Sequence, residues 1–157
     1  MAERSDQTLD DLDRALILTL ADHPRVSILE LARLLGVARN TVYARLERLQ
    51  ERSVITGFGP DIDLRALGYE VTAFITIVVA QGSFSDVVAE LDRIPNVVEV
   101  HTIAGPGDLH CRVVAASNAG IMEIVEVILR IPGVDRTATA ISLAEQIGYR
   151  PLGLLTD

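Results

Sequence analysis

Arginines and small polar residues gather between positions 38 and 49, where their side chains suit chemistry with a nucleic acid. A guanidinium can donate two parallel hydrogen bonds to guanine, and an asparagine amide can pair in the same way with adenine. Threonine and tyrosine hydroxyls can reach phosphate oxygens. The residues of these types are Arg39, Asn40, Thr41, Tyr43, Arg45 and Arg48. We expect the first four to contact base edges. Arg45 and Arg48, with Arg25, are expected near phosphate, unless Arg45 or Arg48 pairs with a neighbouring acid.

Two apolar stripes at helical spacing must position this surface. One stripe falls at i, i+3, i+4 and i+7, and the other at i, i+4 and i+7: Ile28, Leu31, Ala32 and Leu35, then Val42, Leu46 and Leu49. The link between them, residues 35–37, is short enough for a sharp turn only, and Gly36 can take positive φ there. This spacing predicts a helix-turn-helix, whose second helix enters the DNA major groove. An ordinary helical hairpin with a solvated arginine face remains the alternative.

A further helix is expected from about residue 9 to residue 21. Its apolar face consists of Leu9, Leu12, Leu16 and Leu20. Asp10, Asp11 and Asp13 come at its start, where the helix dipole favours carboxylates, and we expect them to be solvated rather than to bind a cation. The three helices make a predicted DNA-binding domain over residues 1–53.

Charge and composition restrict the class of protein. The formal net charge of −8 argues against a non-specific coat for nucleic acid, yet residues 25–52 hold six arginines and three glutamates. Positive charge therefore gathers where phosphate contacts are expected. The N-terminus has no basic-then-apolar signal pattern, apolar runs are too short to span a bilayer, and a single cysteine cannot form an internal disulfide. We expect a cytoplasmic protein.

Residues 54–68 are expected to link two domains. Residues 54–60 predict a short strand that runs into a connection rich in glycine and proline. A brief helical turn is expected around residues 63–67, ending at Gly68.

An internal repeat organises the second half, residues 69–157. Arg93-Ile94-Pro95-Asn96-Val97 recurs 37 positions later as Arg130-Ile131-Pro132-Gly133-Val134. Each copy closes an apolar helical pattern that lies between two predicted strands. Strands are expected over residues 69–80, 97–103, 109–115 and 135–143. The order is β-α-β-β-α-β, which predicts a ferredoxin-like sheet and an α+β chain overall.

Neither face of the strand expected at residues 69–80 is polar enough to face water. Val71, Ala73, Ile75, Ile77 and Val79 alternate with Thr72, Phe74, Thr76, Val78 and Ala80. Helices can cover only one face of such a sheet, so we expect a second subunit to cover the other.

Together these residues resemble the leucine-responsive/asparagine (Lrp/AsnC) family of transcriptional regulators. The resemblance rests on Leu9-Asp10-Asp11-Leu12-Asp13-Arg14, Pro24-Arg25, Glu30-Leu31-Ala32, Gly36-Val37, Thr41-Val42, Arg45-Leu46, Leu49 and Val54-Ile55-Thr56-Gly57-Phe58. It implies a winged-helix-like DNA-binding domain, a βαββαβ sensing domain that dimerises, assembly to higher oligomers such as octamers, and a small effector, often an amino acid.

The family's effector loop corresponds here to residues 105–108. The expected effector-binding residues are His101, Thr102, Ala104, Gly105, Gly107 and Asp108. Glycines let backbone N–H groups approach a carboxylate, and an aspartate can meet an ammonium group. The same loop can equally be a tight hairpin. Ala38, Ser53 and Pro106 depart from the family's usual residues, and Ala38 leaves the recognition helix without its usual N-cap.

Other chemistry finds little support. His101 and His110 are expected opposite each other across a hairpin near Asp108 and Cys111, but strand positions or a pocket suit them better than a metal site. Cys111 is expected to be a buried small hydrophobe. We expect no cofactor and no bound metal, and no catalytic constellation suggests an enzyme. A DNA-compacting architectural protein that needs no effector is the alternative to an effector-responsive regulator.

Overall fold

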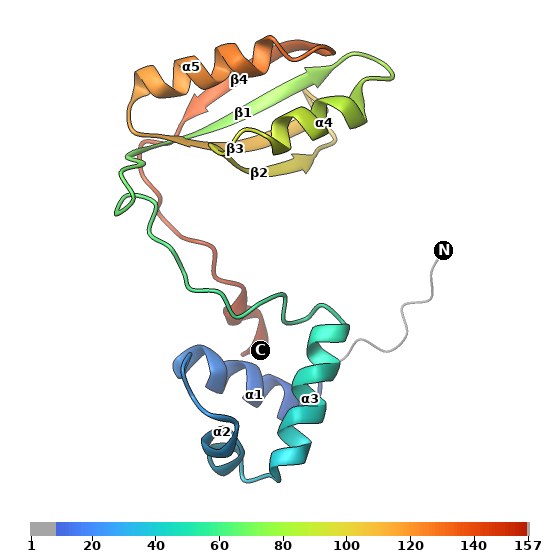
Figure 1. Ribbon diagram of the computed structural model, residues 1–157, viewed down its shortest axis with the longest axis vertical. Helices are drawn as coiled ribbons and strands as arrows, with labels where there is room; N and C mark the ends of the chain where they lie inside the picture. The colour runs from blue at the N-terminus through green and yellow to red at the C-terminus, as the bar shows by residue number, and fades with distance from the viewer. Residues whose placement is uncertain (1–8, 157) are drawn as a thin grey trace. The chain divides into compact units, whose positions relative to one another are not determined.

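The computed structural model describes residues 9–156, which divide into two compact units (Figure 1). The first unit contains residues 9–61 and 148–156, and the second contains residues 62–147. The division expected from the sequence assigned the whole C-terminal segment to the second domain. In the structure, residues 148–156 group with the first.

Three helices form the first unit: α1 (Asp11–Asp22), α2 (Ile28–Leu35) and α3 (Arg39–Glu51). Asp10 caps α1, since its side chain accepts a hydrogen bond from the N–H of Asp13, and Ser27 caps α2 in the same way through Glu30. The buried core of this unit is small: Leu16, Leu31, Ala32, Val42, Leu46 and Leu49. The predicted helix-turn-helix is thus confirmed.

Gly36 makes the sharp turn between α2 and α3. It adopts the left-handed conformation at φ 66°, which ends α2 without the cost that a Cβ would bring. Ser53, after α3, also has positive φ, 55°, a left-handed conformation that is strained for a residue with a Cβ.

The strand predicted over residues 54–60 does not form, so that prediction was wrong. These residues follow α3 as irregular chain. Valine, isoleucine and threonine favour extended backbone, but a strand needs a partner to receive its hydrogen bonds, and the described part of the helical unit offers no strand. The turn predicted near residues 63–67 is present and ends at Gly68 with φ 89°.

A four-stranded sheet and two helices form the second unit. Its elements are β1 (Val71–Val79), α4 (Phe84–Asp92), β2 (Val97–Thr102), β3 (Leu109–Ala115), α5 (Asn118–Leu129) and β4 (Val134–Ile141). The strand order is β2-β3-β1-β4, and all neighbours are antiparallel. The predicted βαββαβ arrangement is confirmed, and the arginine of the repeated motif, Arg93 or Arg130, is the C-cap residue of each helix.

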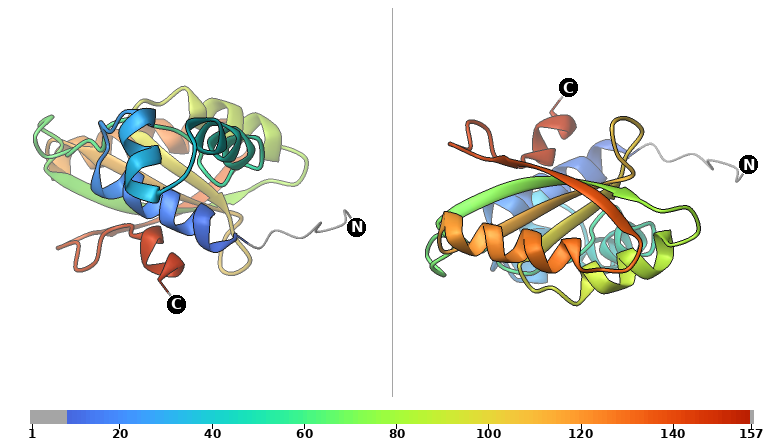
Figure 2. Two further views of the ribbon diagram at one scale, coloured as in Figure 1. Left: turned by 90° about the horizontal axis from the view of Figure 1, so that it is seen from below. Right: turned by 90° about the horizontal axis from the view of Figure 1, so that it is seen from above.

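Both helices of this unit lie on one face of the sheet (Figure 2). Alternate residues of β1, namely Ala73, Ile75 and Ile77, are fully buried beneath them. The opposite face carries Phe74, which is 37% exposed and stacks on the His110 ring with centroids 5.7 Å apart. Within residues 62–147, which form this unit, no helix covers the second face of the sheet.

The C-terminal segment ends in a short 3₁₀ helix, η1 (Pro151–Leu155), beside α1 (Figure 1). A guanidinium nitrogen of Arg14 on α1 donates to the carbonyl of Leu155 at 3.2 Å. Within residues 9–156, no helix has both the length and the apolar character to cross a membrane.

Candidate functional site

The beginning of α3 presents the polar surface that the sequence predicts. Ala38 occupies the N-cap position and makes no side-chain hydrogen bond there, so the first backbone N–H groups of α3 lack a side-chain acceptor. Arg39, Asn40 and Tyr43 are exposed and Thr41 is half-buried. In the described part of the chain, no ion pair joins Arg39 to an acid. This surface carries free donors and no neutralising carboxylate in the first turn of the helix.

The side chains of Arg45 and Arg48 bind carboxylates at the start of α1. A guanidinium nitrogen of Arg45 lies 3.0 Å from Oδ1 of Asp13 and also hydrogen-bonds Asp10. Arg48 donates to Oδ2 of Asp13 at 2.6 Å. Both arginines, predicted among the DNA-binding residues, thus take the alternative that the sequence left open and pair with acids of α1.

The sequence predicts solvated carboxylates at the start of α1, and this holds for the exposed Asp10 and Asp11 but is wrong for Asp13. Asp13 is completely buried, because α3 packs over it and supplies two guanidinium groups to its carboxylate. The hydrogen bond from Arg45 lowers the pKa of Asp10, helped by the backbone N–H of Asp13. The hydrogen bonds that Arg45 donates to the carboxylates of Asp10 and Asp13 raise the pKa of Arg45.

Sequence reasoning missed this buried pairing, although a signal for it exists. Asp10 and Asp13 are three positions apart, and so are Arg45 and Arg48. Residues three apart lie on one side of a helix. The matched spacing of two acids at the start of α1 and two arginines on α3 could therefore have identified these residues as partners.

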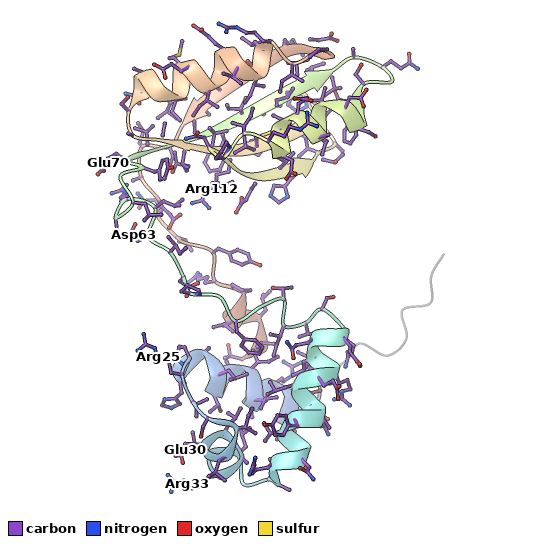
Figure 3. All side chains as sticks on the ribbon, in the orientation of Figure 1. Arg25, Glu30, Arg33, Asp63, Glu70 and Arg112 are labelled. Atoms are coloured by element: carbon purple, nitrogen blue, oxygen red, sulfur yellow. The ribbon has the colours of Figure 1, made fainter. Side chains whose placement is uncertain are left out.

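Arg25 lies in the turn between α1 and α2 and is exposed (Figure 3). Glu30 and Arg33, on α2, pair with each other through two hydrogen bonds of 2.8 and 2.9 Å. Glu30 therefore neutralises the charge of Arg33, whereas no acid of the described chain forms an ion pair with Arg25.

The predicted effector loop links β2 to β3 and is held firmly against β1. The Asp108 N–H donates to the carbonyl of Ile77, and its carboxylate accepts from the N–H of Val79 at 2.8 Å. A Cβ on Gly107 would lie 2.5 Å from Cγ2 of Thr76, so only glycine fits there. The loop is thus a braced hairpin, and one carboxylate oxygen of Asp108 already has a backbone donor.

The remaining predicted loop residues lie around this hairpin. His101, Thr102, Ala104 and Gly105 are exposed, and Gly107 is half-buried. His101 faces His110 across the β2–β3 ladder, which confirms the predicted register. His110 shares a 3.1 Å hydrogen bond with the Thr76 hydroxyl.

Cys111 lies on the helix-covered side of β3 and is fully buried, as predicted. Burial raises the pKa of its thiol to about 11. The thiolate, which is the reactive form, is therefore scarce at neutral pH.

Comparisons with known proteins agree with this architecture over nearly the whole chain. Residues 9–50 match the AsnC-type helix-turn-helix domain, and residues 72–152 match the Lrp/AsnC ligand binding domain. The HTH-type transcriptional regulator FL11 of Pyrococcus horikoshii is 33% identical over 135 residues, which are 86% of this chain and 89% of that protein.

Two solved structures extend the likeness to three dimensions. AsnC of E. coli superposes with a TM-score of 0.85 at 26% identity, covering 92% of this chain and 99% of that one. A feast or famine regulatory protein of M. tuberculosis, complexed with L-methionine, superposes with a TM-score of 0.79 at 30% identity, covering 91% and 97%. The two domain matches and the relatives together show that this chain belongs to the Lrp/AsnC family of transcriptional regulators.

Proposed function

We propose that this regulator reads a specific DNA sequence with the first turns of α3. The observation that carries the proposal is the exposed set Arg39, Asn40 and Tyr43, with Thr41 beside it, at a helix start without a neutralising acid. Arg39 and Asn40 have the donor geometry for guanine and adenine edges. Arg25 is exposed at the preceding turn and suits a phosphate contact.

A dimer presents two copies of α3 to successive major grooves, about one helical turn of DNA apart. The face of the sheet that α4 and α5 leave uncovered is the surface through which we expect the chain to dimerise. Phe74 is exposed there, and half-buried threonines and Val78 extend the patch along β1. Such a surface is more apolar than water-facing strands usually are. Further association of dimers into a larger ring, such as an octamer, is consistent with the family.

The effector of the proposed regulator is a small molecule, an amino acid, that binds at the β2–β3 loop. Three features support this assignment: the braced backbone around Gly107, the second oxygen of Asp108, and the exposed side chains of His101 and Thr102. The M. tuberculosis relative is complexed with L-methionine. Effector binding acts by changing how the dimers associate, and so changes DNA affinity.

The DNA contacts are tested by comparing Arg39→Ala with Arg25→Ala. Fluorescence anisotropy measures binding of each variant to a duplex from the protein's own promoter and to a random duplex of equal length. We expect Arg39→Ala to lower the ratio of specific to random affinity, since a lost bidentate contact costs about 1–3 kcal/mol of discrimination. Arg25→Ala should weaken both duplexes alike. Equal losses for both variants on both duplexes would contradict the assignment.

The effector is tested by a thermal-shift screen of the common amino acids, because a ligand that binds only the folded state raises the melting temperature. A hit should lose its effect in Asp108→Asn, whose side-chain oxygen can still accept from Val79 while its charge is gone. Footprinting on the promoter with and without that amino acid separates a regulator from an architectural protein. Little sequence preference and unchanged binding with every amino acid would favour the architectural alternative.

A further inference from the structure

Asp13 is the one fully buried charged residue in the described part of the chain. Its two carboxylate oxygens each accept a hydrogen bond from a different arginine of α3, at 3.0 Å from Arg45 and 2.6 Å from Arg48. Asp10, one turn earlier, adds a second carboxylate to the same pair of cations. Two positive and two negative charges therefore meet between α1 and α3, and this flank of α3 is locally neutral.

The two arginines differ from Arg39 in what they can offer DNA. The side chains of Arg45 and Arg48 are 25% and 44% exposed, so they lie at the edge of the helix, within reach of solvent. A phosphate that took either arginine would have to replace a carboxylate that already accepts its hydrogen bonds. Charge-assisted bonds of this kind are among the stronger ones in proteins.

We propose that Asp13, assisted by Asp10, is a positioning residue that withholds Arg45 and Arg48 from the DNA phosphates. This inference rests on the proposed binding of DNA by α3. By neutralising one flank of the recognition helix, the two aspartates reduce sequence-independent attraction to the DNA backbone. The contacts of Arg39 and Asn40 with bases then contribute a larger share of the free energy of DNA binding.

Replacing an aspartate of the ion-pair cluster should leave the fold intact, whereas replacing the arginines would leave Asp13 buried without a cation. The aspartate variants therefore make the proposal testable. Without the Asp13 charge, the partly exposed arginines can turn to water, so Asp13→Asn is expected to fold. Asp10→Asn is milder still, because Asp10 is half exposed and the asparagine oxygen can still accept from the N–H of residue 13 and cap α1.

The experiment measures how the affinity of the full chain depends on salt. Wild type, Asp10→Asn, Asp13→Asn and the double variant are titrated with promoter and random duplexes over a range of salt concentrations. Each arginine that becomes free to contact phosphate should steepen the slope of log affinity against log salt by about 0.9. We expect a steeper slope for each variant, the steepest for the double variant, with a gain of at least about twofold on random DNA and a lower specificity ratio.

Asp11→Asn is the matched control. Asp11 is exposed in the same turn of α1, and no ion pair involves it among residues 9–156. The control changes the net charge by the same amount without releasing an arginine, so its salt slope should stay at the wild-type value. A conventional check of helix content by circular dichroism accompanies every variant.

Three results would overturn the inference. Slopes for Asp10→Asn and Asp13→Asn that match Asp11→Asn would show that the aspartates hold back no phosphate contact, and a loss of affinity at constant slope would indicate a purely structural role. A flatter slope for Arg48→Gln in the wild-type background would show that this arginine already contacts phosphate. Failure of the wild type to prefer its promoter would instead reject the proposed function itself.

Discussion

The helical unit and the sheet unit are stabilised in different ways. Six apolar side chains form the buried core of the helical unit, and a buried carboxylate with two guanidinium partners joins α1 to α3 beside it. The buried core cluster of the sheet unit contains thirteen apolar side chains, and in the residues described no charged group lies among them. A small core buries less apolar area, so directional ion pairs carry more of the orientation of its helices. Substitutions should therefore act by different mechanisms in the two units.

Removing both guanidinium groups should produce the largest effect. Arg45→Met with Arg48→Met leaves Asp13 buried without a cation, which typically costs about 3–5 kcal/mol. Hydrogen exchange of the α1–α3 amides should report this loss, while the amides of β1 and β3 keep their protection. Arg33→Met, which breaks an exposed pair on α2, is the control and should cost no more than about 1 kcal/mol. Similar losses in the two variants would contradict the importance of the buried pairing.

A cavity in the sheet unit should cost nearly as much, for a different reason. Ile75 is fully buried, and Ile75→Ala should destabilise this unit by about 2–5 kcal/mol through lost apolar contact. Phe74→Ala, one position along on the uncovered face, should instead weaken self-association in analytical ultracentrifugation. Comparing these two variants would then distinguish the effect of core packing from the effect of the proposed dimer surface. If Phe74→Ala left the association state unchanged, that surface would not be the dimer interface.

Helix caps provide a smaller test within the helical unit. Ser27 caps α2 through the N–H of Glu30, whereas Ala38 leaves α3 uncapped. We expect Ser27→Ala to lower the free energy of unfolding by about 1 kcal/mol and Ala38→Ser to raise it by a similar amount. Urea denaturation measures both. A destabilising Ala38→Ser would show that the start of α3 cannot accept a capping hydroxyl.

The smallest expected effect depends on pH. Arg45 lowers the pKa of Asp10 below its ordinary value of 3.8. The ion pair therefore stabilises the folded state at any pH where the carboxylate is charged in both the folded and the unfolded chain. The stabilising effect is complete above pH 3.8 and is lost as pH falls through the lowered pKa. Melting temperatures of wild type and Asp10→Asn should therefore differ at neutral pH and converge in acid. A difference that persists or grows in acid would contradict the ion pair.

Local patterns predicted most of the fold, and the failures share a physical cause. Apolar residues alternate along β1, and the repeated motif marks the end of each helix. Residues close together in the sequence therefore predicted these elements. Residues 54–60 have strand propensity, yet pairing depends on a partner strand that local sequence does not describe. The burial of Asp13 depends on residues 32 and 35 positions away. The exposed residues at the start of α3 could be predicted because the apolar stripe of one helix defines its opposite side.

The effector loop illustrates the same limit within a site. Glycine spacing located the turn, but the sequence could not indicate that one oxygen of Asp108 accepts from Val79 on a neighbouring strand. A role for Asp108 in binding must therefore be separated from its role in bracing the loop. Asp108→Asn is informative for this reason.

Amide hydrogen exchange of the full chain, with and without its promoter duplex, tests DNA recognition by α3 most directly. We expect the duplex to protect the amides from residue 38 to residue 43, and to protect them more than a random duplex does at equal salt. Unchanged exchange at the start of α3, or protection confined to the sheet unit, would contradict recognition by this helix.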